Sequence, residues 1–171
     1  LFDELEVKQI HDSEPIRVPQ RTYSELVCEW FPRVLKELVD LKMIYKNHSS
    51  RWSSPAHVIC DSKGKPKRMT MDLRQVNSRL SQTAGIMPDL QMQLTKISGF
   101  KYYTKMDFFK AYWYTPVTQK TSEIFSFSTP FGIYSSRRML QGYHSAVFYF
   151  QNNMETLLNK AGVDFCLWID D

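Results

Sequence analysis

The chain has 171 residues, a formal net charge of +4, 43% hydrophobic residues and 14% aromatic residues. This length suits one domain with a sizeable core, and the hydrophobic content excludes an intrinsically disordered chain. No apolar run is long enough to span a membrane, and the acidic start is not a signal peptide. Because the first residue is not methionine, we expect a piece of a longer protein. The mild positive charge permits nucleic acid as a partner but does not indicate one by itself.

Cysteine and histidine residues give no sign of a metal site. Cys28, Cys60 and Cys166 are widely spaced, so we expect buried free thiols in a reducing compartment. The polar loop 46–57 contains two histidines without a nearby acid, which we interpret as solvated loop residues.

The first half of the chain predicts an arm, a helix and a hairpin. Residues 1–20 contain prolines and lack periodicity, which indicates an extended arm over the surface. Between residues 22 and 41, apolar residues recur at helical spacing, and Pro32 predicts either a kink or a restart of this helix. Two short strands, 56–60 and 67–73, flank a turn rich in helix and strand breakers, so they predict a β-hairpin.

The hairpin is strongly basic. Its tip and returning strand carry Lys63, Lys65, Lys67, Arg68 and Arg74. Such charge commonly serves only as a soluble edge that prevents edge-to-edge pairing. A mobile basic arm could instead close on a triphosphate or on a backbone phosphate. The residues alone leave both interpretations open.

The second half of the chain mixes short helices and strands. The expected elements are a helix Asp89–Ile97 capped by Asp89, a strand Tyr102–Met106, a hairpin of Glu123–Thr129 and Ile133–Met139, a helix from His144 to Gly162, and a strand Asp164–Ile169. Helices interspersed with hairpins predict an α+β fold with an antiparallel sheet.

Three aspartates follow predicted strands. Asp107 follows Met106, while Asp170 and Asp171 follow Ile169. Neighbouring side chains on a regular strand point to opposite faces, so the adjacent pair can converge only at a tight turn. Two such strands side by side would bring three carboxylates together, and a divalent cation would relieve their repulsion. Taken singly, each aspartate is more simply a turn residue or a helix cap, but the set suits metal-assisted phosphoryl transfer.

Four motifs occur in order along the chain: residues 68–77, residues 105–112, residues 140–142 followed by Phe150-Gln151, and residues 168–171. Together they resemble the fingers and palm of a reverse transcriptase, of the type found in Ty3/gypsy long-terminal-repeat retrotransposons and retroviruses. The resemblance runs from about Pro15 to the last residue. It implies a polymerase fingers–palm fold that is truncated before the thumb.

The resemblance also implies roles for individual residues. The catalytic, metal-binding residues would be Asp107, Asp170 and Asp171, with the Phe108 carbonyl as a further ligand. Nucleotide contacts would come from Lys63 or Lys65, Arg68, Tyr112 and Gln141. The Tyr112 ring would lie under the sugar and reject a 2′-hydroxyl. Template contacts would come from Asp72, Arg74 and Asn77.

The chain departs from the family pattern at several positions. Leu140 and Val147 stand where prolines are frequent, and Phe148-Tyr149 stand where small residues are usual. Trp168 replaces the tyrosine that normally precedes the paired acids. These bulky residues bear on the expected shape of the nucleotide pocket.

The implied function is RNA-directed DNA polymerisation, in which deoxynucleotides are added to a primer 3′-hydroxyl by two-metal phosphoryl transfer, with magnesium as the cofactor and manganese as an alternative. The implied partners are an RNA or DNA template with its primer, deoxynucleoside triphosphates and the remainder of a polyprotein, with no membrane. We expect a cytoplasmic retroelement particle or the nucleus as the location. The expected domains are an arm at 1–20, fingers and the start of the palm at 21–100, and an incomplete palm at 101–171.

The alternative is a domesticated or decayed domain that binds nucleic acid or protein without catalysis. The departures at Leu140, Val147 and Trp168 favour it, and the retention of all three acids opposes it. With no thumb to grip the duplex, we expect the isolated chain to extend primers poorly or not at all. An unpaired sheet edge would also permit self-association.

Overall fold

The computed structural model describes residues 2–11, 13–85 and 87–168, which fall into two compact units. The first unit combines residues 1–81 and 112–143, and the second combines residues 82–111 and 144–171. Each unit therefore joins two separate stretches of chain. These boundaries cut across the ranges 21–100 and 101–171, whose assignment to fingers and palm stays a prediction.

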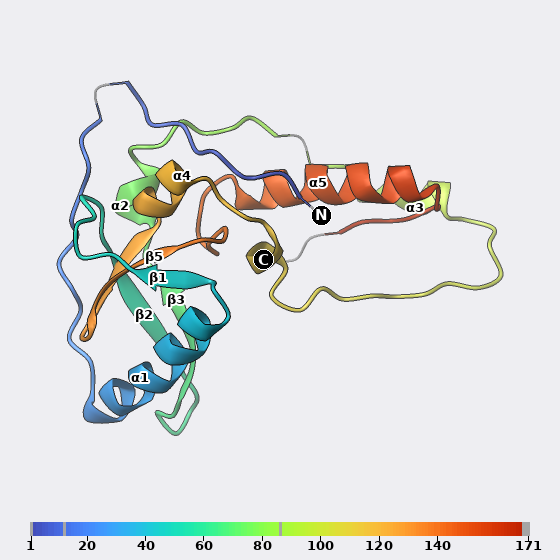
Figure 1. The fold of residues 1–171 in the computed structure, drawn as a ribbon. Helices are drawn as coiled ribbons and strands as arrows, with labels where there is room; N and C mark the ends of the chain where they lie inside the picture. The colour runs from blue at the N-terminus through green and yellow to red at the C-terminus, as the bar shows by residue number, and fades with distance from the viewer. Residues whose placement is uncertain (1, 12, 86, 169–171) are drawn as a thin grey trace. The chain divides into compact units, whose positions relative to one another are not determined.

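A five-stranded sheet forms the centre of the first unit (Figure 1). The strands, in spatial order, are β1 (Ile44–Lys46), β5 (Gly132–Ser136), β4 (Ser126–Thr129), β2 (Ser54–Cys60) and β3 (Pro66–Met71). The two predicted hairpins are confirmed as the antiparallel pairs β2–β3 and β4–β5. The central pair β2–β4 is parallel, so the sheet is mixed rather than purely antiparallel. Periodicity within a strand carries no information about the direction of a distant partner, which is why the sequence did not indicate this pair.

Helix α1 (Glu25–Asp40) confirms the predicted helix and contacts both β1 and β3. It continues through Pro32 as one helix. Its buried side chains are Val27, Phe31 and Leu35, which recur at helical spacing and so form one core-facing stripe. Leu41, expected in this stripe, is exposed because the helix has already ended.

The N-terminal arm is part of the core of the first unit. Leu5 and Val7 are buried, at 5% and 1% exposure. Leu5 forms a parallel bridge with Val117, and the Val7 amide donates a hydrogen bond of 3.0 Å to Thr121 Oγ1. Thr121 belongs to α4 (Gln119–Ile124), a short helix that the sequence pattern did not reveal. The arm is extended as predicted, but it is held in the fold rather than only lying over the surface.

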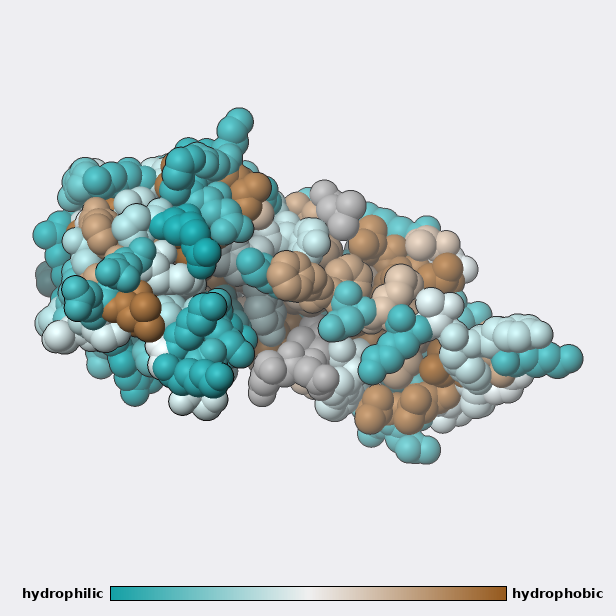
Figure 2. All heavy atoms as spheres, turned by 90° about the horizontal axis from the view of Figure 1, so that it is seen from below, coloured by the Kyte–Doolittle hydropathy of each residue, from teal (hydrophilic) through white to brown (hydrophobic). Residues whose placement is uncertain are grey.

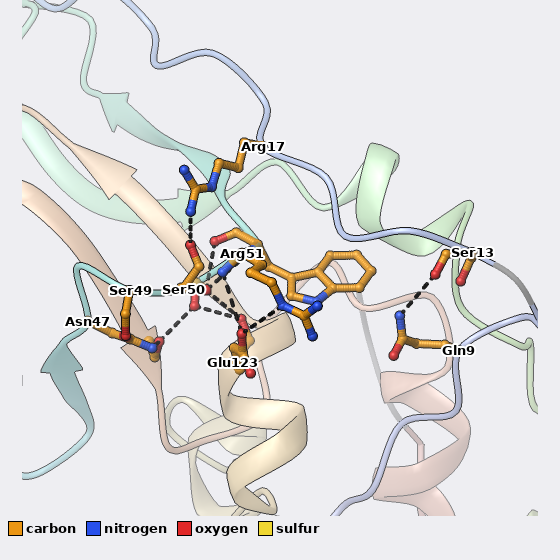
Figure 3. Close-up of polar contacts among 11 residues, drawn as sticks. Gln9, Ser13, Arg17, Asn47, Ser49, Ser50, Arg51 and Glu123 are labelled. Carbon is orange, nitrogen blue, oxygen red and sulfur yellow. Dashed lines mark hydrogen bonds and ion pairs between the residues drawn. The ribbon is translucent and has the colours of Figure 1, made fainter.

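The loop between β1 and β2 also enters the core (Figure 3). Ser50 is buried, and its hydroxyl donates to the backbone carbonyl of Glu123 over 3.3 Å. Arg17 donates to the Ser50 carbonyl over 2.7 Å, and the Arg51 guanidinium lies 3.9 Å from the Glu123 carboxylate. Ser50 and Arg51 are therefore held by contacts to the arm and α4, although both belong to the loop predicted from the sequence. His48 and His57 are both exposed, as expected, although His57 lies in β2 rather than in a loop.

Two helices dominate the second unit, and both confirm their predicted positions. In α3 (Leu90–Lys96), the Asp89 carboxylate accepts a hydrogen bond of 3.0 Å from the Met92 amide, as an N-cap should. Helix α5 (Ala146–Ala161) ends at Gly162, whose left-handed backbone forms the C-cap. Its buried face consists of Ala146, Phe150, Gln151 and Met154.

Neither strand predicted for this unit forms. Residues 101–107 are exposed and lack regular structure, as are 163 and 164 (Figure 1). Residues 165–168 also lack regular structure, and the Leu167 amide donates to the Gln93 side chain over 2.6 Å rather than to a strand. The expectation of strands Tyr102–Met106 and Asp164–Ile169 is wrong among the residues described. Alternating residue types along a segment define two faces, but a strand also needs a neighbouring strand with which to form hydrogen bonds.

The surface of the second unit carries many apolar side chains. Exposed apolar side chains gather on α3 and the following loop: Leu90, Met92, Leu94, Phe100, Tyr102, Tyr103, Met106, Phe108 and Phe109. Figure 2 shows apolar side chains at the molecular surface among hydrophilic ones. None of the helices described is long and apolar enough to cross a membrane. The three cysteines are free as predicted, but none is buried, since Cys60 is exposed and the other two are half-buried.

Candidate functional site

The basic hairpin β2–β3 has a well-ordered turn at its tip. The Asp61 carboxylate accepts hydrogen bonds from the backbone amides of Lys63 and Lys65, at 3.0 and 2.9 Å. The Lys65 amide is the main reason that the pKa of Asp61 lies below its ordinary value. Because the Asp61 carboxylate binds the backbone amides, it fixes the shape of the turn from which the lysine side chains project. Lys63, Lys65, Lys67 and Arg68 are all exposed, so they are accessible to a polyanion.

Asp72 and Arg74, both predicted template contacts, bind each other. Arg74 donates twice to the Asp72 carboxylate, through Nε at 2.8 Å and through a terminal nitrogen at 2.6 Å. Arg21 adds a third side-chain contact at 2.8 Å from outside the motif. The Arg74 hydrogen bond is the main cause that holds the pKa of Asp72 well below its usual range, and the Arg21 hydrogen bond contributes in the same direction. The guanidinium of Arg74 remains largely exposed.

Asn77, the third predicted template contact, is half-buried at the end of the short helix α2 (Arg74–Asn77). Its side-chain amide donates a hydrogen bond of 2.8 Å to the backbone carbonyl of Gly142. Gln141, a predicted nucleotide contact, directly precedes that glycine and is exposed. The first unit thus brings the end of the motif at 68–77 next to the 140–142 part of the third motif.

Tyr112 lies in a short 3-10 helix, η1 (Ala111–Tyr114). Its side chain is half-buried. The Tyr112 carbonyl accepts from the Thr115 amide at 3.2 Å, and the Thr115 carbonyl accepts from the Met139 amide at 3.0 Å. The turn that carries Tyr112 is therefore bonded to the segment that leads into Gln141.

Asp107 lies in the second unit, on the loop after α3. It is exposed, and no hydrogen bond or ion pair joins its carboxylate to another residue in the part of the chain that the structure describes. Next to it, the Phe108 ring packs edge-on against Phe150 of α5, with centroids 6.3 Å apart. This contact ties the loop to the helix immediately after the acid. Asp170 and Asp171 lie outside the described residues.

Within residues 2–11, 13–85 and 87–168, no group of three histidine, cysteine or acidic residues could hold a metal ion. Since two of the three predicted ligands lie beyond these ranges, the three-carboxylate site stays a prediction. Asp107 offers an accessible carboxylate followed by the Phe108 backbone carbonyl. Both are hard oxygen donors, which is the chemistry that magnesium and manganese prefer.

Two of the departures from the family pattern, Leu140 and Phe148, are accommodated by packing within their own units, whereas Trp168 is exposed. Leu140 is buried in the first unit at 1% exposure. In the second unit, Phe148 lies against Gly85, where an added Cβ would come within 2.3 Å of the phenylalanine ring. The loop before α3 thus makes room for the bulky residue by having no side chain at this point.

Comparison with known proteins decides the family. The model of the family described as "Reverse transcriptase (RNA-dependent DNA polymerase)" matches residues 57–171, which is more than half of the chain. The chain belongs to this reverse transcriptase family. Its members generally depend on a divalent metal and bind nucleic acid, and the exposed carboxylate and basic hairpin are compatible with both properties.

The relatives of this reverse transcriptase domain are polyproteins. It is 26% identical over 168 residues to the "Enzymatic polyprotein" of figwort mosaic virus (strain DxS), covering 96% of this chain and 25% of the relative. It is 27% identical over 168 residues to the "Retrovirus-related Pol polyprotein from transposon gypsy" of Drosophila melanogaster, covering 94% of this chain and 16% of the relative. The chain thus spans about a quarter or less of the curated relatives named here.

A solved structure confirms the fold. The protease–reverse transcriptase of prototype foamy virus superposes with a TM-score of 0.74 at 23% identity, covering 87% of this chain and 20% of that one. The chain is thus similar in sequence to a retrotransposon polyprotein and in fold to a retroviral reverse transcriptase.

Sequence reasoning missed two residues of the reverse transcriptase domain that engage predicted site residues. Arg21 binds Asp72, and it precedes α1, far from the motif. Gly142 supplies the carbonyl that Asn77 binds. The first had no signal in the sequence. The second lies within the motif at 140–142, but its partner could not be inferred from the sequence.

Proposed function

We propose that the full-length protein uses this domain to add deoxynucleotides to a primer 3′-hydroxyl under the direction of an RNA or DNA template. The observation that carries the proposal is the family match over residues 57–171, which includes all three acids. Because the relatives are several times longer, the activity is proposed for the full-length protein rather than for these 171 residues alone.

In this proposal, Asp107, Asp170, Asp171 and the Phe108 carbonyl hold magnesium, with manganese as a substitute. Bound magnesium would supply charge stabilisation for the transferring phosphoryl group and would make the primer hydroxyl more acidic. The exposed position of Asp107 and the contact that anchors Phe108 to α5 support this assignment. An acid without an ion pair among the described residues needs to break no internal contact before it binds a cation.

The first unit would bind the incoming nucleotide. We assign the triphosphate to Arg68 and to Lys63 or Lys65, because all three are exposed on one hairpin whose turn is fixed by Asp61. A guanidinium can bind two phosphate oxygens at once, while a lysine supplies a compact charge. Tyr112 would exclude a 2′-hydroxyl, and Gln141 would contact the paired nucleotide. The Arg74 guanidinium, largely exposed beyond its contacts to Asp72, would reach the template backbone.

Primer extension by the full-length protein tests the proposal. We expect magnesium-dependent DNA synthesis on an RNA template, which Asp107→Asn reduces to background. Asp164→Asn is the matched control, because Asp164 is an exposed acid of the same unit with no assigned role. If full-length protein binds template–primer but adds no nucleotide with either metal, the non-catalytic binding module is the correct account.

A further inference from the structure

The backbone of Asn77, from which its hydrogen-bonding side chain extends, is held in place by buried neighbours. Asn77 ends α2, a short helix in which Val76 is fully buried. Leu73, which precedes the helix, is also buried, and its carbonyl accepts a hydrogen bond of 2.7 Å from the backbone N–H of Asn77. Two buried apolar anchors and a backbone hydrogen bond therefore hold the base of the side chain.

The acceptor lies in a turn that is also anchored on both sides. Leu140 and Tyr143 are buried at 1% and 5% exposure, and the Tyr143 amide donates to the Leu140 carbonyl over 3.3 Å. Between them, Gly142 has a φ of +100°, a conformation that favours glycine. Gln141 and Gly142 are both exposed. The 2.8 Å hydrogen bond from Asn77 fixes the Gly142 carbonyl, one residue after Gln141.

We propose that Asn77 is a positioning residue for the nucleotide: it orients the Gln141–Gly142 turn rather than contacting the template. This inference rests on the proposed function, because it takes Gln141 as a nucleotide contact. A donor fixed by α2 sets the plane of the peptide that follows Gly142, and so limits how the neighbouring Gln141 can tilt. The Met139 amide, two residues before Gln141, donates to the carbonyl of Thr115, which follows the Tyr112 turn. The Asn77–Gly142 hydrogen bond therefore also limits movement between Gln141 and Tyr112.

Two substitutions separate the hydrogen bond from the shape of the side chain. Asn77→Asp keeps the shape but places an acceptor against the Gly142 carbonyl, and Asn77→Ala removes the group. Gln75→Ala is the matched control, because Gln75 is an exposed amide residue on the same helix. Steady-state kinetics on the full-length protein give KM for the deoxynucleotide and kcat, and a separate titration gives Kd for template–primer.

Both Asn77 variants should raise the KM for the deoxynucleotide by about 5- to 10-fold, the size expected for one lost hydrogen bond. We expect little change in kcat or in the Kd for template–primer, and no effect from Gln75→Ala. Combined with Gln141→Ala, an Asn77 substitution should raise KM no further, because both act through one group. A weakened template–primer Kd with an unchanged KM would overturn the proposal in favour of direct template contact.

A second readout needs no catalysis. In the 171-residue chain, Asn77→Ala should speed hydrogen exchange of the Tyr143 amide, which closes the turn, and Gln75→Ala should not. Unchanged exchange would refute the positioning role even if the polymerase is active. Faster exchange in a full-length protein that adds no nucleotide would instead locate the failure in the proposed function.

Discussion

Arg21 and Asp72 lie 51 positions apart in the sequence and form an ion pair of 2.8 Å. Arg74 binds the same carboxylate, so one acid joins the segment before α1 to the junction of β3 and α2. The Asp72 amide also donates to the Pro55 carbonyl of β2 over 3.1 Å. Asp72 therefore has a structural role in the first unit, whatever contact Arg74 makes with nucleic acid.

This cluster predicts an acid-dependent stability. Arg74 and Arg21 lower the pKa of Asp72 in the folded state, so the unfolded chain takes up a proton first as the pH falls. The stabilisation is complete above the unfolded pKa of roughly 4 and is lost as the pH falls toward the lower folded pKa. Asp72→Asn should cost about 1 kcal/mol of unfolding free energy at pH 7, because partial exposure of the contacts screens them.

Urea unfolding between pH 3 and pH 7 measures this effect. The difference between wild type and Asp72→Asn should shrink as the pH decreases through this range. Asp40→Asn is the control, because the Asp40–Lys36 pair is exposed on both sides and should contribute little. An Asp72→Asn protein with the same stability as wild type at pH 7 would show that the cluster does not stabilise the fold.

Gly85 is predicted to be intolerant of any side chain. A Cβ at this position would come within 2.3 Å of the Phe148 ring, so Gly85→Ala forces the loop or the ring to move. We expect a loss of about 1–3 kcal/mol, the usual cost of overpacking. Thermal unfolding of the single and double variants measures it: Phe148→Ala should recover much of the loss caused by Gly85→Ala. Independent, additive effects of the two substitutions would contradict the contact.

Thr121 is predicted to hold the N-terminal arm through its hydroxyl. Thr121→Val keeps the shape of the side chain but leaves the buried Val7 amide without this acceptor. An unpaired buried donor costs about 1–3 kcal/mol, so unfolding free energy should fall by that amount. Hydrogen exchange at Val7 should accelerate at the same time. The neighbouring Lys120→Ala, an exposed position of α4, should leave both quantities unchanged.

Local sequence patterns predicted the helices and hairpins that are specified by interactions between residues close together in the sequence. The apolar stripe around Phe31, the Asp89 cap and the Gly162 stop each act within a few residues, so α1, α3 and α5 were expected close to their observed positions. The two hairpins were equally visible, since a hairpin turn fixes its own pairing. The parallel β2–β4 pair and the buried arm depend on distant partners and had no local signal.

The sequence predicted which residues belong to the site better than it predicted their contacts in space. The motif containing Asp72, Arg74 and Asn77 was recognised, but the contacts of these side chains to Arg21 and Gly142 were not. The prediction that a strand leads to Asp107 failed, because alternation cannot show whether a segment has a partner strand. What the sequence does indicate is the order of the acids along the chain.

The central claim is that Asp107, Asp170 and Asp171 together bind divalent cations at one site. Manganese titration of the isotope-labelled 171-residue chain tests it most directly, because paramagnetic manganese broadens the amide signals of nearby residues. We predict that the signals of Asp107 and of Asp170–Asp171 broaden together, and that Asp107→Asn abolishes both effects while Asp164→Asn abolishes neither. Broadening of only one of the two segments, or broadening that survives Asp107→Asn at both, would contradict the account.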